Sequence, residues 1–423
     1  MLVLSLKEIK GLTILTTQKK LHFFIVDDDQ ITIELYTKLL CDAGYQVSSS
    51  TSSIDAIAQI VNLRPDCVIS DLTMPEIDGV DLFQKVRDAL NVKPAFVIIT
   101  NKVFEFDRRR ALSTGVDGYL TKPIDPKTFV DDLLKIVSSE MTVQFWGVRG
   151  TLPVPGKETI RYGGNTNCVT VAVGNKHFFI FDAGTGIKEL SNYLVKQNKF
   201  PMSAKVFITH PHYDHINGIP FFVPFYMKGN EFEIFGPSHG EFGIDKLVSG
   251  QMDSVYFPIT IKEFSAALTF HTLTEEEIII DDFHVQTLLL NHPGRCLGYR
   301  LNYKNKSFCY VTDNELYSDG STHGNVFEEE RLVQFVKDAD MLIMDTTYDE
   351  EYFKKVGWGH SSVERVVDVA HKANVKLLCL FHHDPDQFDE DIDLKLKHAQ
   401  DLLKQRGSST VCIAPHEGQQ III

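Results

Sequence analysis

The chain has 423 residues, of which 43% are hydrophobic and 23% charged, a composition that is typical of globular protein and excludes a disordered tail. This length allows two or three domains, each able to bury a core of its own. The formal net charge of −15 argues against a nucleic-acid surface built on general attraction to phosphates. The seven cysteines are scattered and odd in number, so we expect free thiols in a reducing cytoplasm rather than a disulfide framework.

Residues 1–20 form a predicted N-terminal extension. They are apolar in places, but Lys7, Glu8 and Lys10 interrupt any signal-peptide core. No stretch of the sequence approaches the roughly 18 uninterrupted apolar residues of a membrane span. We therefore expect a cytoplasmic protein.

Residues 21–138 alternate between short apolar runs and amphipathic segments. A strand is predicted at 21–26, and a helix over Gln30–Asp42, where apolar residues recur at helical spacing. Further strands are predicted at 66–71, 95–100 and 117–122, and a closing helix at 125–137. This alternation predicts an α/β domain, doubly wound and flavodoxin-like, in which chemistry collects at the carboxyl ends of the strands.

Acidic residues stand at those strand ends. Asp27, Asp28 and Asp29 follow the first strand, Asp71 follows the third, and Lys122 follows the fifth. Carboxylates that converge on one point repel each other unless a hard cation lies among them, and oxygen ligands in a partly hydrated site suit Mg²⁺. A nearby lysine would balance charge added to one carboxylate. The pattern therefore predicts a Mg²⁺ site at this edge of the sheet.

The motifs IVDDD, SDLTMPEIDG, VIIT and GYLTKP, in this order, resemble the receiver domain of bacterial response regulators over residues 21–138. The resemblance implies that Asp71 accepts a phosphoryl group, with a cognate histidine kinase as partner. It implies that Mg²⁺ is bound by Asp27, Asp28 and Asp71. The implied switch and phosphate-contacting residues are Thr100, Tyr119 and Lys122.

Two points remain open for this domain. Asn101 stands where the family usually has a small residue, which puts the lifetime of the phosphoryl group in question. A degenerate receiver kept as a scaffold is the alternative interpretation. Receivers often dimerise, and residues 105–115 could contribute to a homodimer.

Residues 141–423 are rich in β signals. Helical patterns intervene at about Ile187–Lys196, Ser361–Ala373 and Asp391–Arg406. Strands are predicted at 143–148, 166–173, 177–184, 204–209, 232–236, 283–290, 307–313 and 339–345. The pattern predicts two packed β-sheets with helices outside, an αββα sandwich.

The stretch ITHPHYDHING, residues 208–218, places four potential metal ligands close together: His210, His212, Asp214 and His215. A loop at a strand end can turn all four side chains toward one cavity. Imidazole with carboxylate is the ligand mix of Zn²⁺ or, with less affinity, of Mn²⁺ or Fe. Four residues cannot complete two coordination shells. Other strand ends could supply the rest through His292, Asp313 and His382, with adjacent His383 as the rival of His382.

This set resembles the metallo-β-lactamase-fold hydrolases over residues 141–423. The resemblance implies two divalent transition metals, Zn, Mn or Fe. One would be held by His210, His212 and His292, and the other by Asp214, His215 and His382, with Asp313 bridging both. Two such metals suit hydrolysis, because they acidify a water and polarise the electrophile. Asp214 would also accept the proton of the water.

The segment GWGHSS bears on whether the substrate is a lactam, a thioester or a phosphodiester. His360 opens a helical segment, where it could bind a phosphoryl oxygen or protonate a leaving alkoxide. The arrangement resembles the phosphodiesterase branch of the superfamily, in which a histidine precedes the last metal ligand. A structural role at a helix N-terminus is the alternative for His360.

Substrate contacts are predicted less specifically. Arg149 and Asn165 lie on glycine-rich turns where they could meet phosphate, and Tyr348, with Asp345, ends a strand that faces the site. The aromatic segment 218–236 could stack a nucleobase or form core.

The combined hypothesis is a two-component response regulator whose output is a dinuclear-metal phosphodiesterase. It would hydrolyse a small cyclic nucleotide or cyclic dinucleotide, and phosphorylation of Asp71 would modulate it. One alternative is an RNA-processing metallo-nuclease, which the acidic charge disfavours. The others are a non-hydrolytic di-iron sensor of the same fold and an adaptor with an inert hydrolase domain.

Overall fold

The computed structural model describes residues 3–9, 12–18, 21–90, 94–102, 111, 114–137, 140–174, 177–198, 200–255, 257–317, 326–348 and 358–423, the first two ranges by their backbone alone. The chain divides into two compact units, Met1–Ser138 with Gly174–Lys176, and Ser139–Val173 with His177–Ile423. Among the described helices, none combines the length and the apolar character needed to cross a membrane.

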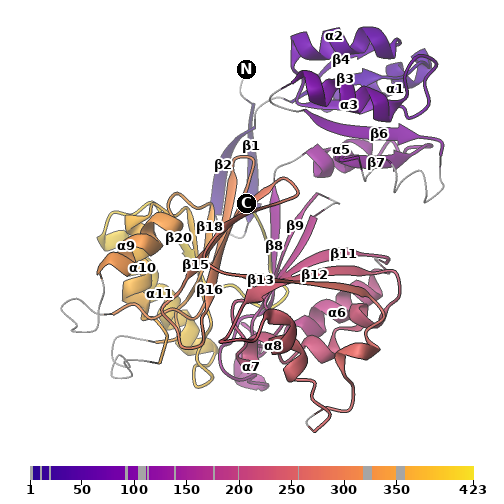
Figure 1. Cartoon of the computed structure of the whole chain (residues 1–423). Coiled ribbons are helices and arrows are strands. Elements are labelled where there is room, and N and C mark those ends of the chain that lie inside the picture. The colour runs from indigo at the N-terminus through magenta and orange to yellow at the C-terminus, as the bar shows by residue number, and fades with distance from the viewer. Residues whose placement is uncertain are drawn as a thin grey trace. The chain divides into compact units, whose positions relative to one another are not determined.

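The first unit contains a five-stranded parallel sheet in the order β4-β3-β5-β6-β7 (Figure 1). Its strands are β3 (His22–Val26), β4 (Gln46–Ser50), β5 (Cys67–Ser70), β6 (Ala95–Thr100) and β7 (Gly118–Thr121). Its described helices are α1 (Gln30–Asp42), α2 (Ser53–Leu63), α3 (Gly79–Ala89) and α5 (Phe129–Val137). The predicted doubly wound receiver fold is thereby confirmed.

Alternation along β3 explains why both faces of this sheet are covered. Phe23 and Ile25 pack with α1 and α5, whereas Phe24 and Val26 pack with α2 and α3. Asp29 caps α1 by accepting hydrogen bonds from the next turn of backbone N–H groups. The carboxylate of Asp29 is therefore engaged by the helix, and the predicted cation site is left with the carboxylates of its neighbours Asp27 and Asp28.

Two strands precede this domain. β1 (Val3–Ile9) and β2 (Leu12–Gln18) form an antiparallel hairpin within the predicted N-terminal extension. Residues 105–115, proposed for a dimer contact, lie outside the described residues except for Ala111, Thr114 and Gly115.

The second unit contains two seven-stranded sheets, in the orders β13-β12-β11-β10-β9-β8-β21 and β14-β15-β16-β17-β18-β19-β20. The first sheet comprises β8 (Met141–Gly147), β9 (Cys168–Val173), β10 (His177–Phe181), β11 (Ser203–Phe207), β12 (Glu231–Pro237), β13 (Ala267–Leu273) and β21 (Gln420–Ile422). The second comprises β14 (Glu277–Ile280), β15 (Phe283–Leu289), β16 (Leu297–Tyr303), β17 (Lys306–Val311), β18 (Met341–Asp345), β19 (Leu377–Phe381) and β20 (Val411–Ile413).

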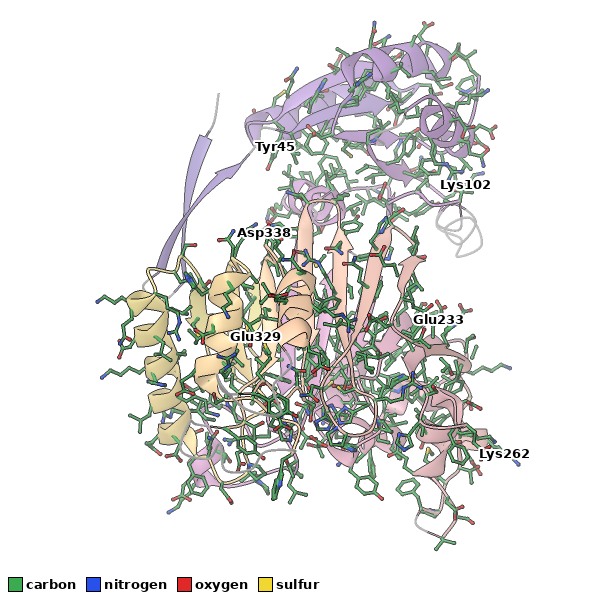
Figure 2. All side chains as sticks on the ribbon, turned by 60° about the vertical axis from the view of Figure 1, so that its left-hand side comes forward. Tyr45, Lys102, Glu233, Lys262, Glu329 and Asp338 are labelled. Carbon is green, nitrogen blue, oxygen red and sulfur yellow. The ribbon has the colours of Figure 1, made fainter. Side chains whose placement is uncertain are left out.

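Helices cover the outer faces of both sheets, which confirms the predicted αββα sandwich (Figure 1). The first sheet carries α6 (Ile187–Lys196), α7 (Tyr213–Ile216) and α8 (Ile244–Gly250). The second carries α9 (Val326–Phe335), α10 (Val363–Lys372) and α11 (Asp389–Gln405). Charged side chains such as Lys262 and Asp338 lie on the outside of this unit (Figure 2).

The core between the two sheets is rich in phenylalanine. Phe179 and Phe181 point into it from β10, while Ile180 between them faces α6 on the other side. Burying each such ring contributes about 1.5–3 kcal/mol to the free energy of folding. This packing fixes the strand ends, from which the polar residues of the next section project.

Candidate metal centre

The four clustered ligands of the sequence motif lie after β11. His210 lies three residues beyond the end of β11, and His212 is the N-cap of the short helix α7, which carries Asp214 and His215. The motif was expected to be a loop; it includes one helical turn instead. That turn directs the side chains of Asp214 and His215 back toward His210, and Asp214, His215 and His210 are all buried.

Three imidazole nitrogens converge at one side of the cluster. His210 Nε2 lies 2.8 Å from His212 Nδ1. His292 Nε2, which arrives from the end of β15, lies 3.2 Å from the same His212 atom. These three histidines, which we name the first triad, are close enough to share one cation.

A second set of donors lies beside the first. His215 Nε2 is 3.1 Å from Asp214 Oδ2, and His382 Nε2 is 3.2 Å from the same oxygen. Asp214, His215 and His382 form the second triad and are likewise close enough to share one cation.

Asp313 lies between the two triads. Its Oδ2 is 3.2 Å from His215 and 3.3 Å from His382, whereas its Oδ1 is 3.9 Å from His210 and 3.8 Å from His292. One carboxylate oxygen therefore faces each triad, which is the arrangement that a bridging ligand requires.

The donor set fits divalent transition metals. Ligands at about 2.0–2.1 Å from a tetrahedral Zn²⁺ lie about 3.3 Å from one another, close to the separations within each triad. Burial raises the pKa of Asp214 and Asp313, but the neighbouring His215 and His382 outweigh it and hold both pKa values well below the usual range. Burial, with the charge of His215, lowers the pKa of His210. Burial lowers the pKa of His215, but Asp214 and Asp313 outweigh it and raise this pKa well above the usual range, so His215 would release a proton when a cation binds, since neutral imidazoles and ionised carboxylates are the forms that bind metal.

Several ligands are oriented by a second layer of polar groups. His215 Nδ1 lies 2.8 Å from Asp182 Oδ2, which also accepts a hydrogen bond from Tyr310. Thr347 Oγ1 lies 3.0 Å from His382 Nδ1. Such contacts fix which ring nitrogen faces the cluster.

The backbone at three strand ends is unusual. Asp182, Asp313 and His382 have φ values of 55°, 45° and 59°, in the left-handed region that non-glycine residues seldom occupy. Such conformations cost about 1–3 kcal/mol each and concentrate at functional sites. Here they turn the side chains from the strand ends into the cluster.

His360 lies beside the cluster. Its Nδ1 is 2.9 Å from Asp345 Oδ2 and 3.8 Å from Asp313 Oδ1. Burial lowers its pKa, but Asp345 outweighs burial and raises it to about 9, so the imidazole is cationic near neutral pH. Tyr348, a predicted substrate contact, is buried with its ring 5.6 Å from that of His360.

The two adjacent histidines after β19 have different surroundings. His382 points into the second triad, as described above. His383 is fully buried beside Tyr162, with ring centroids 6.2 Å apart, and burial lowers its pKa well below the usual range. Gly150 packs so tightly on His382 that an added Cβ would lie 2.1 Å from its ring. The structure therefore brings His382, and not His383, into the cluster.

Arg149 differs from the expectation that it meets phosphate. Its side chain is fully buried, and its guanidinium donates to the carbonyl oxygens of Gly163 and Gln387. The structure contradicts a substrate contact, because this guanidinium is enclosed by backbone. Asn165 is half-buried, and its side chain donates to Glu417 Oε2 at 3.0 Å. The sequence alone did not distinguish an arginine that hydrogen-bonds to the backbone of neighbouring loops from one that binds a ligand.

The acidic residues of the first unit also converge. Lys122 Nζ lies 2.8 Å from Asp27 Oδ2 and 3.0 Å from Asp71 Oδ1. Burial raises the pKa of Asp27, although Lys122 opposes this. Asp71 is nearly buried, whereas Asp28 is exposed. This site offers oxygen donors only, which is the chemistry that Mg²⁺ prefers.

Of the predicted switch residues, Thr100 is the last residue of β6 and Tyr119 lies within β7. Thr100 is buried, and its hydroxyl accepts a hydrogen bond from the Lys102 backbone N–H at 3.4 Å. Tyr119 donates its hydroxyl proton to the carbonyl oxygen of Lys102 at 2.8 Å. Asn101, which lies between Thr100 and Lys102 in the sequence, is exposed.

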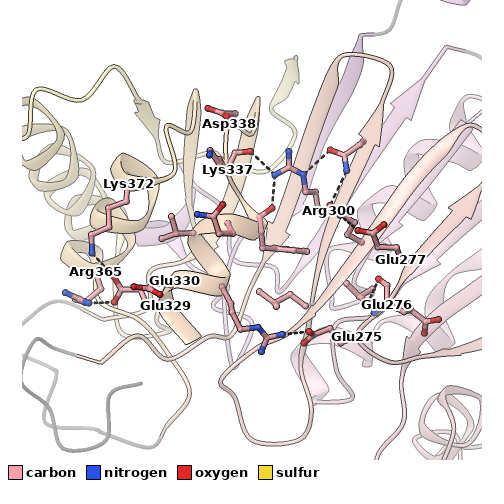
Figure 3. A pocket seen from close by; sticks show the side chains of 18 residues that line it. Glu275, Glu276, Glu277, Arg300, Glu329, Glu330, Lys337, Asp338, Arg365 and Lys372 are labelled. Atoms are coloured by element: carbon pink, nitrogen blue, oxygen red, sulfur yellow. Dashed lines mark hydrogen bonds and ion pairs between the residues drawn. The ribbon is translucent and has the colours of Figure 1, made fainter. Parts of the chain in front are cut away.

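A separate groove of about 1310 Å³ lies between α9 and the β14–β16 face of the second sheet (Figure 3). Arg331 pairs there with Glu275, and Arg365 and Lys372 both pair with Glu329. The groove holds none of the predicted site residues, and its ion pairs are formed within the protein. The histidine cluster is therefore the better candidate for chemistry.

Comparisons with known proteins give two family matches. The response regulator receiver domain matches residues 23–134, and the beta-lactamase superfamily domain matches residues 177–383. The response regulator SaeR of Staphylococcus epidermidis is 32% identical over 109 residues, which cover 26% of this chain and 47% of SaeR. The chain thus spans about half the length of that relative.

Two further relatives match the second unit. Ribonuclease Z of Thermoplasma acidophilum is 24% identical over 292 residues, 59% of this chain and 88% of that protein. The metallo-beta-lactamase fold protein YhfI from Bacillus subtilis matches with a TM-score of 0.48 and 16% identity, over 67% of this chain and 100% of the other. The chain therefore combines two families, and a response regulator receiver domain at residues 23–134 is fused to a domain of the beta-lactamase superfamily.

Proposed function

We propose that this chain is a two-component response regulator whose output domain is a dinuclear-metal phosphodiesterase. The observation that carries the proposal is the position of Asp313, with one oxygen toward each triad and His360 beside it. The class of output is supported further by the likeness to a ribonuclease, an enzyme that cleaves phosphodiesters.

The metals would be held by the seven residues of the two triads and Asp313. A pair of divalent transition metals, Zn²⁺, Mn²⁺ or Fe, supplies Lewis acidity for hydrolysis near neutral pH when bound. The protein brings these ligands, two carboxylates and five histidines, together in one cluster in which only His212 is exposed. Asp214 is placed to accept the proton of the attacking water, because its Oδ2 lies in the second triad.

His360 would act at the other end of the reaction. Hydrolysis of a phosphodiester adds water across one P–O bond and releases an alcohol, so the leaving alkoxide needs a proton. The imidazolium of His360, held by Asp345, can donate that proton from Nε2, since its Nδ1 is engaged by the carboxylate. The competing interpretation, a structural residue at a helix N-terminus, predicts no effect on the leaving-group step.

The receiver would control this activity. In the proposal, a histidine kinase donates a phosphoryl group to Asp71, with Mg²⁺ held by Asp27, Asp28 and Asp71. Lys122 is already within 3.0 Å of Asp71 and would balance the added charge. Thr100 and Tyr119 would then change their hydrogen bonds and transmit the change.

The proposed substrate is a small cyclic nucleotide or cyclic dinucleotide. A signal-dependent receiver joined to a hydrolase suits removal of a signalling molecule, and this part rests on the pairing of domains rather than on a residue. The overall charge of −15 opposes binding of long RNA.

The test uses the full chain with Mn²⁺ or Zn²⁺ and bis-p-nitrophenyl phosphate. We expect turnover, its loss in His212→Ala, and a decrease in kcat of about 10²–10⁴-fold in His360→Ala. His398→Ala, at an exposed position paired with Glu364, is the matched control. Absence of turnover, or equal turnover in wild type and His212→Ala, would overturn the proposal. Cyclic nucleotides and dinucleotides then serve as candidate substrates.

An RNA-processing nuclease is the second candidate, and the likeness to ribonuclease Z is the observation that favours it. The two candidates share the metal cluster and differ in the size and charge of the substrate. Cleavage of a structured RNA without cleavage of cyclic nucleotides would establish the nuclease instead.

A further inference from the structure

The segment that carries His360 is held by the loop after β17. Glu315, two residues beyond Asp313, is buried, and its Oε2 accepts a hydrogen bond of 3.0 Å from the Gly359 N–H. Ser361 donates its hydroxyl proton to the carbonyl oxygen of Asn314. The residues on both sides of His360 are therefore fixed to the loop that presents Asp313.

Gly359 also orients a histidine of the first triad. Its carbonyl oxygen lies 2.9 Å from His292 Nδ1, so this ring nitrogen carries the proton and donates it. The Nε2 lone pair of His292 is then directed to the cluster. Gly359 has φ +84°, and an added Cβ would lie 2.1 Å from His292 Nδ1, so this approach depends on glycine.

The same loop holds the backbone beside His292. The Asn291 side chain donates to the carbonyl oxygen of Glu315 at 2.9 Å, and the Glu315 N–H donates to the carbonyl oxygen of Asn291 at 2.8 Å. Glu315 is therefore bonded through its backbone to the loop of His292 and through its carboxylate to the segment of His360. Asp313 Oδ1 also lies 3.8 Å from a ring nitrogen of each of these histidines, whereas Glu315 is hydrogen-bonded to the backbone beside each of them.

We propose that Glu315 is a positioning residue that couples the first triad to His360. The inference rests on the proposed function in taking the first triad as a metal site and His360 as the proton donor. When Glu315 holds the Gly359 N–H, the Gly359 carbonyl is in place for His292 and the next residue is in place beside Asp313. Loss of the carboxylate leaves a buried N–H unpaired and frees Gly359 to move. Metal binding at His292 and placement of His360 then weaken together.

The primary experiment is calorimetric titration of Mn²⁺ into full-length, EDTA-treated protein in a buffer with excess Mg²⁺, which occupies the receiver carboxylates. We expect wild type to bind two equivalents, and Glu315→Ala to bind one of them about 10–100-fold more weakly, as is typical when the group orienting a ligand is lost. Glu315→Gln keeps an oxygen acceptor for the Gly359 N–H and is expected to retain both affinities. Glu241→Ala, at an exposed position away from the cluster, is the control.

A second readout follows the His360 segment without catalysis. Trp358 is 60% exposed and Trp146 is 6% exposed, so acrylamide quenching of fluorescence reports mainly on Trp358, two residues before His360. We expect Mn²⁺ to change this quenching in wild type and Glu315→Gln but not in Glu315→Ala. By linkage, a metal that orders His292 must also bias the segment bonded to it.

Kinetics separate positioning from a general structural role. With bis-p-nitrophenyl phosphate, Glu315→Ala is expected to lower kcat with little change in KM, and to have no further effect on kcat in a His360→Ala background. Unchanged metal affinities and unchanged quenching in a folded Glu315→Ala protein would overturn the inference, as would a Gln variant that behaves like Ala.

The test still gives an answer if Glu315→Ala does not fold or if wild type shows no hydrolysis. If Glu315→Ala does not fold, Glu315→Asp shortens the side chain and retains its charge, and it must weaken one Mn²⁺ equivalent for the inference to stand. If wild type binds two equivalents but hydrolyses no phosphodiester, the proposed function fails. The calorimetry and the quenching still decide whether Glu315 couples the two histidines.

Discussion

The molecule contains two clusters of charged residues at the carboxyl ends of strands, and they differ in chemistry. The cluster of the receiver consists of carboxylates around Lys122, with Asp28 exposed to water. The cluster of the lactamase-superfamily domain consists mostly of imidazoles, and a second layer such as Asp182 and Thr347 orients them. One site offers oxygen donors, of which Asp28 is exposed, and the other offers mostly nitrogen donors, of which His210, His215 and His382 are buried.

This difference indicates how each site treats a cation. Oxygen donors with remaining water positions suit Mg²⁺, which keeps part of its hydration shell and exchanges readily. Imidazoles oriented by a partner, as His215, His292 and His382 are, suit a transition metal that stays bound. We therefore expect a transient cation in the receiver and resident cations in the other domain.

Among the variants that test this difference between the two sites, Asp313→Asn should have the largest effect on metal content and hydrolysis. The substitution removes the negative charge and replaces one of the two oxygens, each of which faces one triad, by an amide nitrogen, while the shape of the side chain is nearly kept. We expect the metal content of purified protein to fall from two equivalents to one or less, and hydrolysis of bis-p-nitrophenyl phosphate to fall to background. Metal analysis of the dialysed protein and a rate assay measure the two quantities.

The receiver provides the internal control for that variant. Mg²⁺-dependent binding of beryllofluoride to the receiver should be the same in Asp313→Asn and wild type, because the receiver cluster has its own ligands. If the variant retained two metal equivalents, Asp313 would not be a bridging ligand. The expected difference between resident cations in the histidine cluster and a transient cation in the receiver would then be unsupported.

Arg149→Met should have the next largest effect, and it should act on stability. Removal of the buried guanidinium leaves the carbonyl oxygens of Gly163 and Gln387 without this donor, at a cost of about 2–5 kcal/mol in the free energy of unfolding. KM for a phosphodiester should change little in the folded fraction. Urea unfolding followed by fluorescence measures the stability, since Trp146 and Trp358 both lie in this unit. A raised KM with unchanged stability would restore the substrate-contact interpretation.

Asp71→Asn should have a smaller effect that appears only with a phosphoryl mimic. We expect beryllofluoride with Mg²⁺ to change kcat or KM of wild type by about 5- to 150-fold, which is the usual range of coupling between two sites. The variant should show no such response. Activity assays with and without beryllofluoride measure it, and an equal response in both proteins would place the control outside Asp71.

The fold and most of the histidine cluster could be predicted because both depend on local pattern. Apolar runs predicted β5 and β6, and helical spacing predicted the bounds of α1 and α6 to the residue. Ligands such as His210 and Asp214 lie within one short motif, and His292 and Asp313 could be found because each follows an apolar strand.

Other features depend on contacts between segments that are distant in the sequence, so local sequence pattern could not predict them. The sequence favoured His382 over His383 because His382 comes first after an apolar strand, but no sequence pattern indicated the left-handed backbone at His382. Arg149 looked like an anion-binding residue on a glycine-rich turn, yet long-range packing encloses it. Glu315 and Gly359 gave no motif, because their roles follow from a hydrogen bond across 44 residues of sequence.

Asp281→Asn should have the smallest effect, on the stability of the lactamase-superfamily domain. Asp281 Oδ2 lies 3.3 Å from His177 Nδ1 and 3.1 Å from Lys205 Nζ, and the hydrogen bond with His177 and the charge of Lys205 outweigh burial and lower the pKa of Asp281. Its left-handed backbone is tolerated by asparagine, so the substitution tests charge alone.

The sign of the pH dependence follows from that lowered pKa. The stabilisation is fully present above the unfolded pKa of about 3.9 and is lost as the pH falls through the lower folded value. Because the Asp281 side chain is 41% exposed, we expect only about 0.5–1 kcal/mol between wild type and Asp281→Asn at pH 7. This difference should shrink below about pH 4, measured by urea unfolding with tryptophan fluorescence. The exposed neighbour Asp282→Asn is the matched control. A difference that grew on acidification would mean that Asp281 is protonated more readily in the folded state, and the ion pairs would then not stabilise this domain.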